Sequence, residues 1–184
     1  MIERLINDMN MALDHNCFLP ALAIALMLPD ICGKAAYPNK NVSERYVQWY
    51  DENVGKYDRD PDDKNAPHLD GKIIYNLRCE FLHAGNPNID KDKAHKEGNH
   101  IDRFVLFTEN KQEFDFPHDI IITKESNSGI LTHYAHSVSI RRLCLITSAQ
   151  AMKFYSKHKD LFNFFNYTIK DIDRDADELY DLPI

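Results

Sequence analysis

Apolar positions in the first third of the chain recur at the spacing of an α-helix. Residues 2–13 carry them at i, i+3, i+4 and i+7, which predicts a helix with one buried face. The segment 17–33, CFLPALAIALMLPDICG, is apolar on every side, which predicts a helix buried all round at the centre of the fold. We expect Pro20 in its first turn, a kink or an end at Pro29, and Gly33 at its end.

Polar residues mark the ends of the predicted helices. Asp30, near the end of the apolar segment, is interpreted as a cap or turn residue at an exposed end. Ser43 is the expected N-cap of a helix over 43–54, and Ser139 is the expected N-cap of a last long helix over 140–158. The aromatic residues of the helix over 43–54 recur at helical spacing, which is typical of a core face.

After residue 102 the hydrophobic period changes to two, which is typical of β-strands. Three short segments have this pattern: 103–108, 119–123 and 130–136. A turn over 126–129 joins the last two. The whole pattern predicts a mainly α fold, a bundle of four to five helices with a small antiparallel β insertion. We expect a single domain over 1–184, with a loop and the β-rich insertion over 86–138 and an acidic tail over 170–184.

The charge balance limits which partners the surface can bind. The 184 residues include 22 Lys and Arg against 29 Asp and Glu, a formal net charge of −7. This balance disfavours sequence-independent binding to phosphate backbones, so a nucleic acid must be held by a local patch. The adjacent pair Arg141 and Arg142 is interpreted as a solvated helix start. A contact with phosphate is the alternative if that pair lies near Arg78.

Cysteine spacing and apolar runs indicate a soluble, reduced protein of the cytoplasm. The four cysteines are widely spaced and form no Cys-x-x-Cys pair. The apolar run 17–29 is too short to span a bilayer, so no membrane contact is expected. In the loop over 86–100, the spacing of Asp and His residues matches no EF-hand or zinc pattern, so we expect no metal and no cofactor.

The stretch IIYNLRCEFLHAGN, residues 73–86, combines an apolar face with a polar stripe. At about 100° per residue, four side chains share one arc that must face the core: Ile73, Ile74, Leu77 and Phe81. Four others form a stripe on the other side: Asn76, Cys79, Glu80 and His83. Arg78 lies at the edge of the apolar arc, about 140° from His83, so in one ideal helix the two side chains do not point at the same atom. Gly85 is placed to end the helix.

The run LRCEFLH, with Arg78 and His83, resembles the Arg-x4–6-His signature of the HEPN superfamily. The order of the predicted helices is also similar to a HEPN-like bundle: apolar over 17–33, aromatic over 43–54, the Arg–His helix, and a late amphipathic helix over 139–157. The resemblance covers about half of the chain and leaves the β insertion and the tail unexplained. It implies a metal-independent endoribonuclease of a toxin or defence type. It further implies a homodimer whose two motifs face each other across the two-fold axis, with RNA as substrate and an antitoxin or regulatory protein as partner.

The residue types suit the chemistry that the resemblance implies. His83 can act as general acid or base while the RNA 2′-OH attacks the adjacent phosphate, because histidine titrates near neutral pH. Arg78 is always charged and can bind the phosphate oxygens as negative charge builds up. Asn76 and Glu80 share the stripe and are candidates to orient the ring or the substrate. Cys79 stands where active members of the superfamily often carry Asn, Asp or His, and a thiol is a poorer orienting group.

Other interpretations of the same residues remain open. The stripe is also the expected solvated face of an amphipathic helix, with Cys79 as a small, half-buried filler. Cys79 is within reach of His83 as a nucleophile, although no oxyanion hole or third member accompanies the pair. A catalytically silent HEPN-like module that dimerises or holds a partner protein has the same fold. In a helical regulator unrelated to HEPN proteins, the sheet over 103–136 makes the contacts through aromatic residues such as Phe107 or Tyr134.

Overall fold

The structure is a computed structural model that describes residues 1–57, 68–84, 103–108, 119–126 and 129–165. Within these ranges the fold is mainly α, as predicted. It contains five α-helices: α1 (Ile2–Asp14), α2 (Phe18–Ala36), α3 (Val42–Asn53), α4 (Gly71–Ala84) and α6 (Ile140–Lys157). It also contains two 3-10 turns and three strands: η1 (Gly55–Tyr57), η3 (Lys159–Phe162), β1 (Arg103–Phe107), β2 (Asp119–Ser126) and β3 (Gly129–Ser139).

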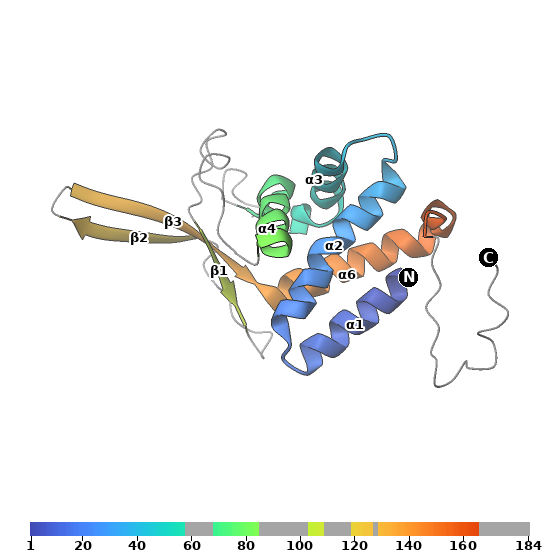
Figure 1. Ribbon diagram of the computed structural model, residues 1–184, viewed down its shortest axis with the longest axis horizontal. Coiled ribbons are helices and arrows are strands. Elements are labelled where there is room, and N and C mark those ends of the chain that lie inside the picture. Colours follow the sequence, from blue (N-terminus) through green and yellow to red (C-terminus); the bar gives the residue numbers. More distant parts are fainter. Residues whose placement is uncertain (58–67, 85–102, 109–118, 127–128, 166–184) are drawn as a thin grey trace.

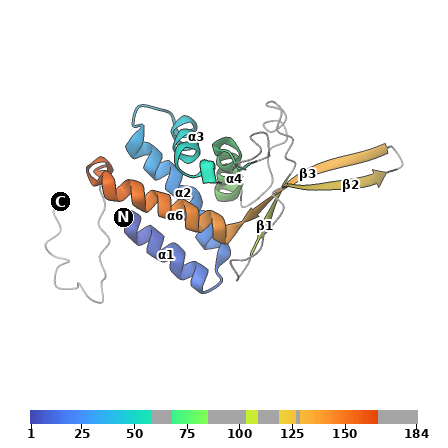
Figure 2. The ribbon, with the colours of Figure 1, turned by 180° about the vertical axis from the view of Figure 1, so that it is seen from behind.

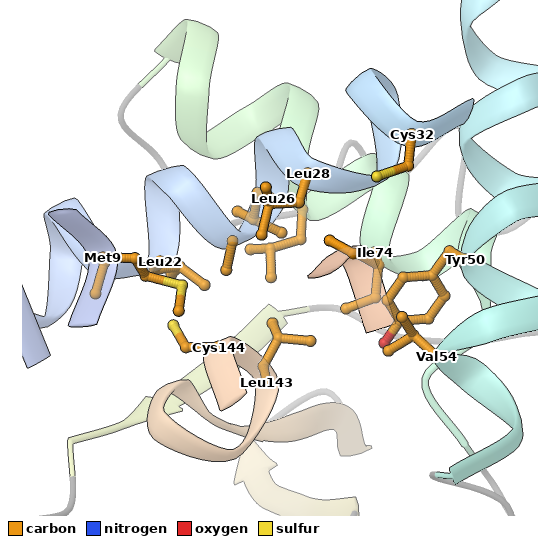
Figure 3. Packing of buried hydrophobic residues seen from close by; sticks show 14 of the residues in the cluster. Met9, Leu22, Leu26, Leu28, Cys32, Tyr50, Val54, Ile74, Leu143 and Cys144 are labelled. Carbon is orange, nitrogen blue, oxygen red and sulfur yellow. The ribbon is translucent and has the colours of Figure 1, made fainter. Parts of the chain in front are cut away.

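Helix α2 lies at the centre of the bundle and packs against α1, α3, α4 and α6 (Figure 1). Figure 2 shows the same arrangement from behind, with α1 and α6 on one side of α2 and α3 and α4 on the other. One buried apolar cluster joins all five helices (Figure 3). The stripe of α1 and the aromatic face of α3 both belong to it, which confirms those two predictions: Ile2, Ile6, Met9, Leu13, Tyr46, Trp49 and Tyr50.

The central helix differs from its prediction in three ways. It is not buried all round, because Leu19 and Met27 are 56% and 39% exposed. It does not end at Pro29 but runs on to Ala36. Proline removes one backbone hydrogen bond from the helix, and packing against four neighbouring helices outweighs that loss. Gly33 lies inside the helix, where a Cβ would meet a backbone carbonyl oxygen of α3 at 2.7 Å. Position 33 therefore requires glycine, because the backbones of α2 and α3 meet there.

Helix α2 is 19 residues long and apolar enough to cross a membrane by length and composition. The expectation that this segment is too short to span a bilayer is therefore wrong, because the helix continues past residue 29. Half of its most apolar window is buried inside the bundle. That burial is compatible with the core helix of a soluble protein.

The caps of two helices test the cap predictions. Ser139 caps α6 as predicted, because its hydroxyl accepts a hydrogen bond from the Arg142 N–H at 3.0 Å. At α3 the prediction is wrong: Asn41, not Ser43, is the N-cap and accepts from the Glu44 N–H at 2.9 Å. The Ser43 hydroxyl donates to the Asn41 side chain at 2.9 Å and so supports the cap from within the first turn.

The three strands form one mixed sheet in the order β1-β3-β2. Strands β2 and β3 are antiparallel as predicted, and Figures 1 and 2 show their hairpin extending away from the helices. Strand β1 is parallel to β3, so the prediction of a wholly antiparallel insertion is wrong. Alternation along a strand sets which residues share a face, but it does not encode the direction of the neighbouring strand. Strand β3 runs directly into α6 and so joins the sheet to the bundle.

Several predictions concern residues outside the described ranges. The whole polar loop over 86–100 lies there, with its residues Asp90, Asp92, His95 and His100, and so does Gly85. The centre of the turn over 126–129 and the acidic tail over 170–184 also lie outside the described residues. The division of the chain into one domain with an insertion over 86–138 and this tail stays a prediction.

Candidate functional site: an arginine and a histidine on helix α4

Helix α4 carries the site and is fixed at its start by contacts with α3. The Gly71 N–H donates to the Asp51 carboxylate at 2.7 Å, and the Ile73 N–H donates to the Asp70 carboxylate at 2.8 Å. A Cβ on Gly71 would lie 2.6 Å from the Val47 carbonyl oxygen, so the two backbones approach closely here. The Asp70 carboxylate caps the first turn of α4, and the contacts of Gly71 with Asp51 and Val47 set the position of α4 against α3.

The two faces of α4 are those that the sequence predicts. The apolar arc faces the core, with Ile73, Ile74 and Leu77 buried and Phe81 packed half-buried against them. The stripe on the other side becomes more exposed along the helix. Three of its members are half-buried and the last one is exposed: Asn76, Cys79, Glu80 and His83. The imidazole is therefore the member of the stripe most accessible to a substrate.

Arg78 and His83 lie in contact within one helix. The distance from Arg78 Nη1 to His83 Nε2 is 3.2 Å. The expectation that the two side chains do not meet in one helix is wrong, because an arginine side chain is long enough to lie along the helix surface. A guanidinium has only donors, so this contact is a hydrogen bond in which Arg78 donates and Nε2 holds a lone pair. The imidazole proton then sits on Nδ1.

Asp30 of α2 holds Arg78 from the other side. Its Oδ2 is 3.4 Å from Arg78 Nη2, and its Oδ1 accepts from Arg45 of α3, at 3.0 Å from Nη2 and 3.3 Å from Nε. The three side chains are only 16–23% exposed. Asp30 is thus not a cap at an exposed end, as the sequence suggested. Because α2 continues to Ala36, its carboxylate lies between two neighbouring helices.

This cluster places two guanidinium groups around one carboxylate, which leaves one positive charge in excess. The excess is local, since the whole chain carries a net charge of −7. Within the described part of the chain, Arg78 Nε is buried and has no hydrogen-bond partner. That nitrogen is not accessible to a ligand, so the local excess of positive charge is what makes the cluster the kind of patch that phosphate binding requires in an acidic protein.

Two tyrosines and a cysteine line the inner side of the arginine. Arg78 Nη1 is 4.0 Å from Cys79 Sγ, and Tyr75 is hydrogen-bonded to the same thiol. The Tyr75 and Tyr46 rings pack edge to face with their centroids 5.2 Å apart, and the Tyr46 hydroxyl donates to the Leu26 carbonyl at 3.1 Å. Burial raises the pKa of both tyrosines, with neighbouring Cys79 adding to the effect on Tyr75 and Tyr50 adding to that on Tyr46. Both hydroxyls therefore stay neutral donors beside the arginine.

Other predicted members of the site are not brought to the imidazole. Among the described residues, no hydrogen bond or ion pair joins Asn76, Cys79 or Glu80 to His83. The thiol instead contacts Arg78 and Tyr75, so a Cys–His nucleophile pair has no geometric support. The role of Asn76 and Glu80 as orienting groups stays a prediction.

The adjacent arginines at the start of α6 bind other elements. Arg141 donates to the Leu13 carbonyl at 3.2 Å, and Arg142 donates to the Tyr57 carbonyl at 3.4 Å. Their contacts tie α6 to the end of α1 and to η1. Within the described ranges, no group of three His, Cys, Asp or Glu side chains comes together as a metal site.

Two members of the cluster, Asp30 and Arg45, were not predicted as site residues. One signal for Asp30 was present, because it is the one charged residue between positions 18 and 33, inside an otherwise apolar helix. No sequence pattern marked Arg45 as a site residue, because it lies 15 positions from Asp30 and the residues around it have the pattern of an ordinary aromatic helix. Comparisons of the chain with protein-family models, with curated proteins and with solved structures found no match, so the chemistry of the site rests on its own residues and geometry.

Proposed function

We propose that the protein is a metal-independent endoribonuclease in which His83 is the general acid–base and Arg78 stabilises the charge on the phosphate. The contact of 3.2 Å between Arg78 Nη1 and His83 Nε2 carries this proposal. It brings a permanent cation and a titratable imidazole to one place, and the imidazole is exposed. A phosphodiester that binds there meets both groups at once.

The proposed reaction begins when a phosphate oxygen replaces His83 as the acceptor for Arg78 Nη1. This exchange frees the lone pair of Nε2, which then takes the proton of the ribose 2′-OH. The 2′ oxygen attacks the phosphorus, and the bond from phosphorus to the 5′ oxygen breaks. The leaving 5′ oxygen takes up a proton from the imidazolium or from water. Arg78 donates to the oxygens on which negative charge accumulates.

This route requires RNA, because the nucleophile is the 2′-OH of the substrate itself. The products are one fragment with a 2′,3′-cyclic phosphate and one with a free 5′-OH. DNA of the same sequence, or RNA with one deoxyribose at the cleaved position, is not cut there. No metal takes part, so chelation of divalent ions leaves the rate unchanged.

The wider setting of this activity belongs to the same proposal and rests on the resemblance to HEPN proteins. The protein acts as a homodimer of a toxin or defence type, in the cytoplasm, with an antitoxin or regulatory protein as its partner. The four unpaired cysteines suit a reducing compartment. The contact within one α4 means that one chain holds both groups, so the dimer serves substrate binding or regulation and is not required to bring Arg78 to His83.

A second candidate is a catalytically silent HEPN-like module that dimerises or binds a partner protein. The observation that favours it is the ion pair with Asp30, which already occupies one side of the Arg78 guanidinium. Cys79 also stands where active HEPN proteins often carry a better orienting group. In this function the cluster ties α2, α3 and α4 together, and no reaction takes place on α4.

The test is cleavage of mixed RNA in EDTA by the purified protein, by His83→Ala and by a matched control, His15→Ala. His15 is another exposed histidine, at the end of α1. We expect the wild type and His15→Ala to cut equally and His83→Ala to lose at least about 100-fold in rate, as expected for removal of a general acid–base group. Circular dichroism of the three proteins should match.

The other outcomes separate the candidates. Equal cutting by all three proteins contradicts the role of His83 and indicates a site elsewhere or a contaminant. If none of them cuts RNA, while sedimentation shows a stable dimer, the silent module becomes the better description. Cutting of the substrate with a deoxyribose at the cleaved position rules out attack by the 2′-OH.

A further inference from the structure

The guanidinium of Arg78 is held between two groups on different helices. Nη2 is 3.4 Å from Asp30 Oδ2, and Nη1 is 3.2 Å from His83 Nε2. An arginine side chain has many rotamers, so a guanidinium without a second contact would spread over many positions along the helix. A second contact on the far side restricts it to those positions that keep Nη1 beside the imidazole.

Asp30 is itself oriented by a third helix. Arg45 binds one oxygen, Oδ1, through both Nε and Nη2, and this leaves Oδ2 for Arg78. Behind this contact, the backbone of Arg45 packs on Gly33, one turn of α2 after Asp30. A chain of direct contacts therefore runs from α3 through α2 to the arginine and histidine of α4.

We infer that Asp30, oriented by Arg45, is a positioning residue that holds the Arg78 guanidinium against His83. Asp30 pairs with Nη2 and leaves Nη1 directed at the imidazole, so it fixes which guanidinium nitrogen meets Nε2. Through that hydrogen bond it also keeps the proton of the imidazole on Nδ1. The consequence for catalysis rests on the proposed nuclease function, whereas the consequence for the histidine tautomer does not.

The experiment measures the ring ¹⁵N chemical shifts of His83 by NMR, at a pH of about 8 where an ordinary imidazole is neutral. The protonated ring nitrogen and the nitrogen with the lone pair have different shifts, so the spectrum reports the tautomer directly. The test variant is Asp30→Asn, which keeps the shape of the side chain and removes its charge. The control is Asp8→Asn, the same change at an exposed position of α1. A His83→Gln spectrum assigns the signals.

We expect the wild type and Asp8→Asn to hold the proton on Nδ1, and Asp30→Asn to move population to the Nε2–H form. Arg45→Lys keeps the charge but loses the two-nitrogen contact, and it should give a smaller shift in the same direction. It also serves as the second variant if Asp30→Asn fails to fold, as judged by near-ultraviolet circular dichroism. Unchanged His83 shifts in the folded variants would overturn the inference.

Kinetics on RNA then separate this inference from the proposed function. If the wild type cuts RNA, Asp30→Asn should lower kcat about 10- to 100-fold and change KM much less, because misplacing a group that acts in the transition state affects the chemical step. A 10- to 100-fold rise in KM with an unchanged kcat contradicts a positioning role in catalysis. If the wild type does not cut RNA, the nuclease proposal fails, and the tautomer measurement still decides the role of Asp30.

Discussion

The two ends of helix α2 take part in different kinds of packing. Its first half contributes Leu22 and Leu26 to the apolar cluster, where Figure 3 draws Leu22 near Met9 of α1 and Cys144 of α6. Its second half carries Asp30, which binds arginines from α3 and α4. Leu28 and Cys32 of the second half also belong to the apolar cluster, so both ends are held by contacts without direction. Only the second half adds charged hydrogen bonds that fix particular atoms.

This difference shows which residues the fold alone requires. Apolar packing accepts any well-shaped set of side chains at those positions, so it stabilises the bundle without specifying chemistry. An ion pair that is three-quarters buried gains less for folding, because both charges lose water when they are buried. A carboxylate kept inside an apolar helix is therefore explained better by the positions that it gives to Arg45 and Arg78 than by stability.

Truncation of the apolar end should have the largest effect on stability. Leu22→Ala removes a fully buried side chain, so the free energy of unfolding should fall by about 2–5 kcal/mol in urea denaturation. Leu19→Ala, the same change on the same helix at a position that is 56% exposed, should change it by about 0.5 kcal/mol or less. Neither change should move the His83 ring signals. Similar losses in both variants would contradict the burial of Leu22.

Gly33→Ala should have a smaller effect on stability than Leu22→Ala, but it should also change the arrangement of the Arg78–His83 site. Alanine favours a helix by about 1 kcal/mol over glycine, yet its Cβ would lie 2.7 Å from the Arg45 carbonyl oxygen and 3.0 Å from the carbonyl carbon. Because both atoms are backbone, we expect a net loss of about 1–2 kcal/mol. The displaced Arg45 should also alter the His83 ring signals, unlike Leu22→Ala. An increase in stability would show that α3 moves away without cost.

Helical periodicity was enough to predict most of the bundle. The stripe of α1, the aromatic face of α3 and the apolar arc of α4 are each set by residues within one helix, and the structure confirms all three. The same local reasoning found Arg78 and His83, since both lie on α4. Their contact was missed because an ideal helix gives the direction of each Cβ, whereas the long arginine side chain ends far from its own Cβ.

The parts that sequence reasoning missed depend on contacts between distant residues. Asp30 meets Arg78 across 48 positions, and β1 pairs with β3 in parallel across about 30 positions, so neither has a spacing that a sequence window can detect. The N-cap at Asn41 was missed for a different reason. Asn41 and Ser43 are both good caps, and the choice between them depends on where the chain leaves α2.

An exposed pair near the ionic end should have the smallest effect, and that effect should depend on pH. The Tyr37 hydroxyl donates to the Glu52 carboxylate. This hydrogen bond, followed by one from Gln48, lowers the pKa of Glu52 below its ordinary value of 4.5. A lowered carboxylate pKa stabilises the fold above about pH 4.5, and the contribution is lost as the pH falls through the lowered value. Burial and then the bond to Glu52 raise the pKa of Tyr37 from 10.0 to about 12.

Tyr37→Phe should therefore lower the free energy of unfolding most between about pH 5 and pH 10. Below that window Glu52 becomes protonated in both proteins, and the difference narrows. Above pH 10 the unfolded wild type ionises at Tyr37 while the folded state does not until about pH 12, so the wild type loses stability that the variant cannot lose. Urea denaturation at about pH 3, 7 and 11 measures this profile, with the exposed Tyr57→Phe as control. A difference that is constant from pH 3 to pH 7 would show that the hydrogen bond does not hold the Glu52 carboxylate in its charged form, in contrast to the partly buried ion pairs of Asp30.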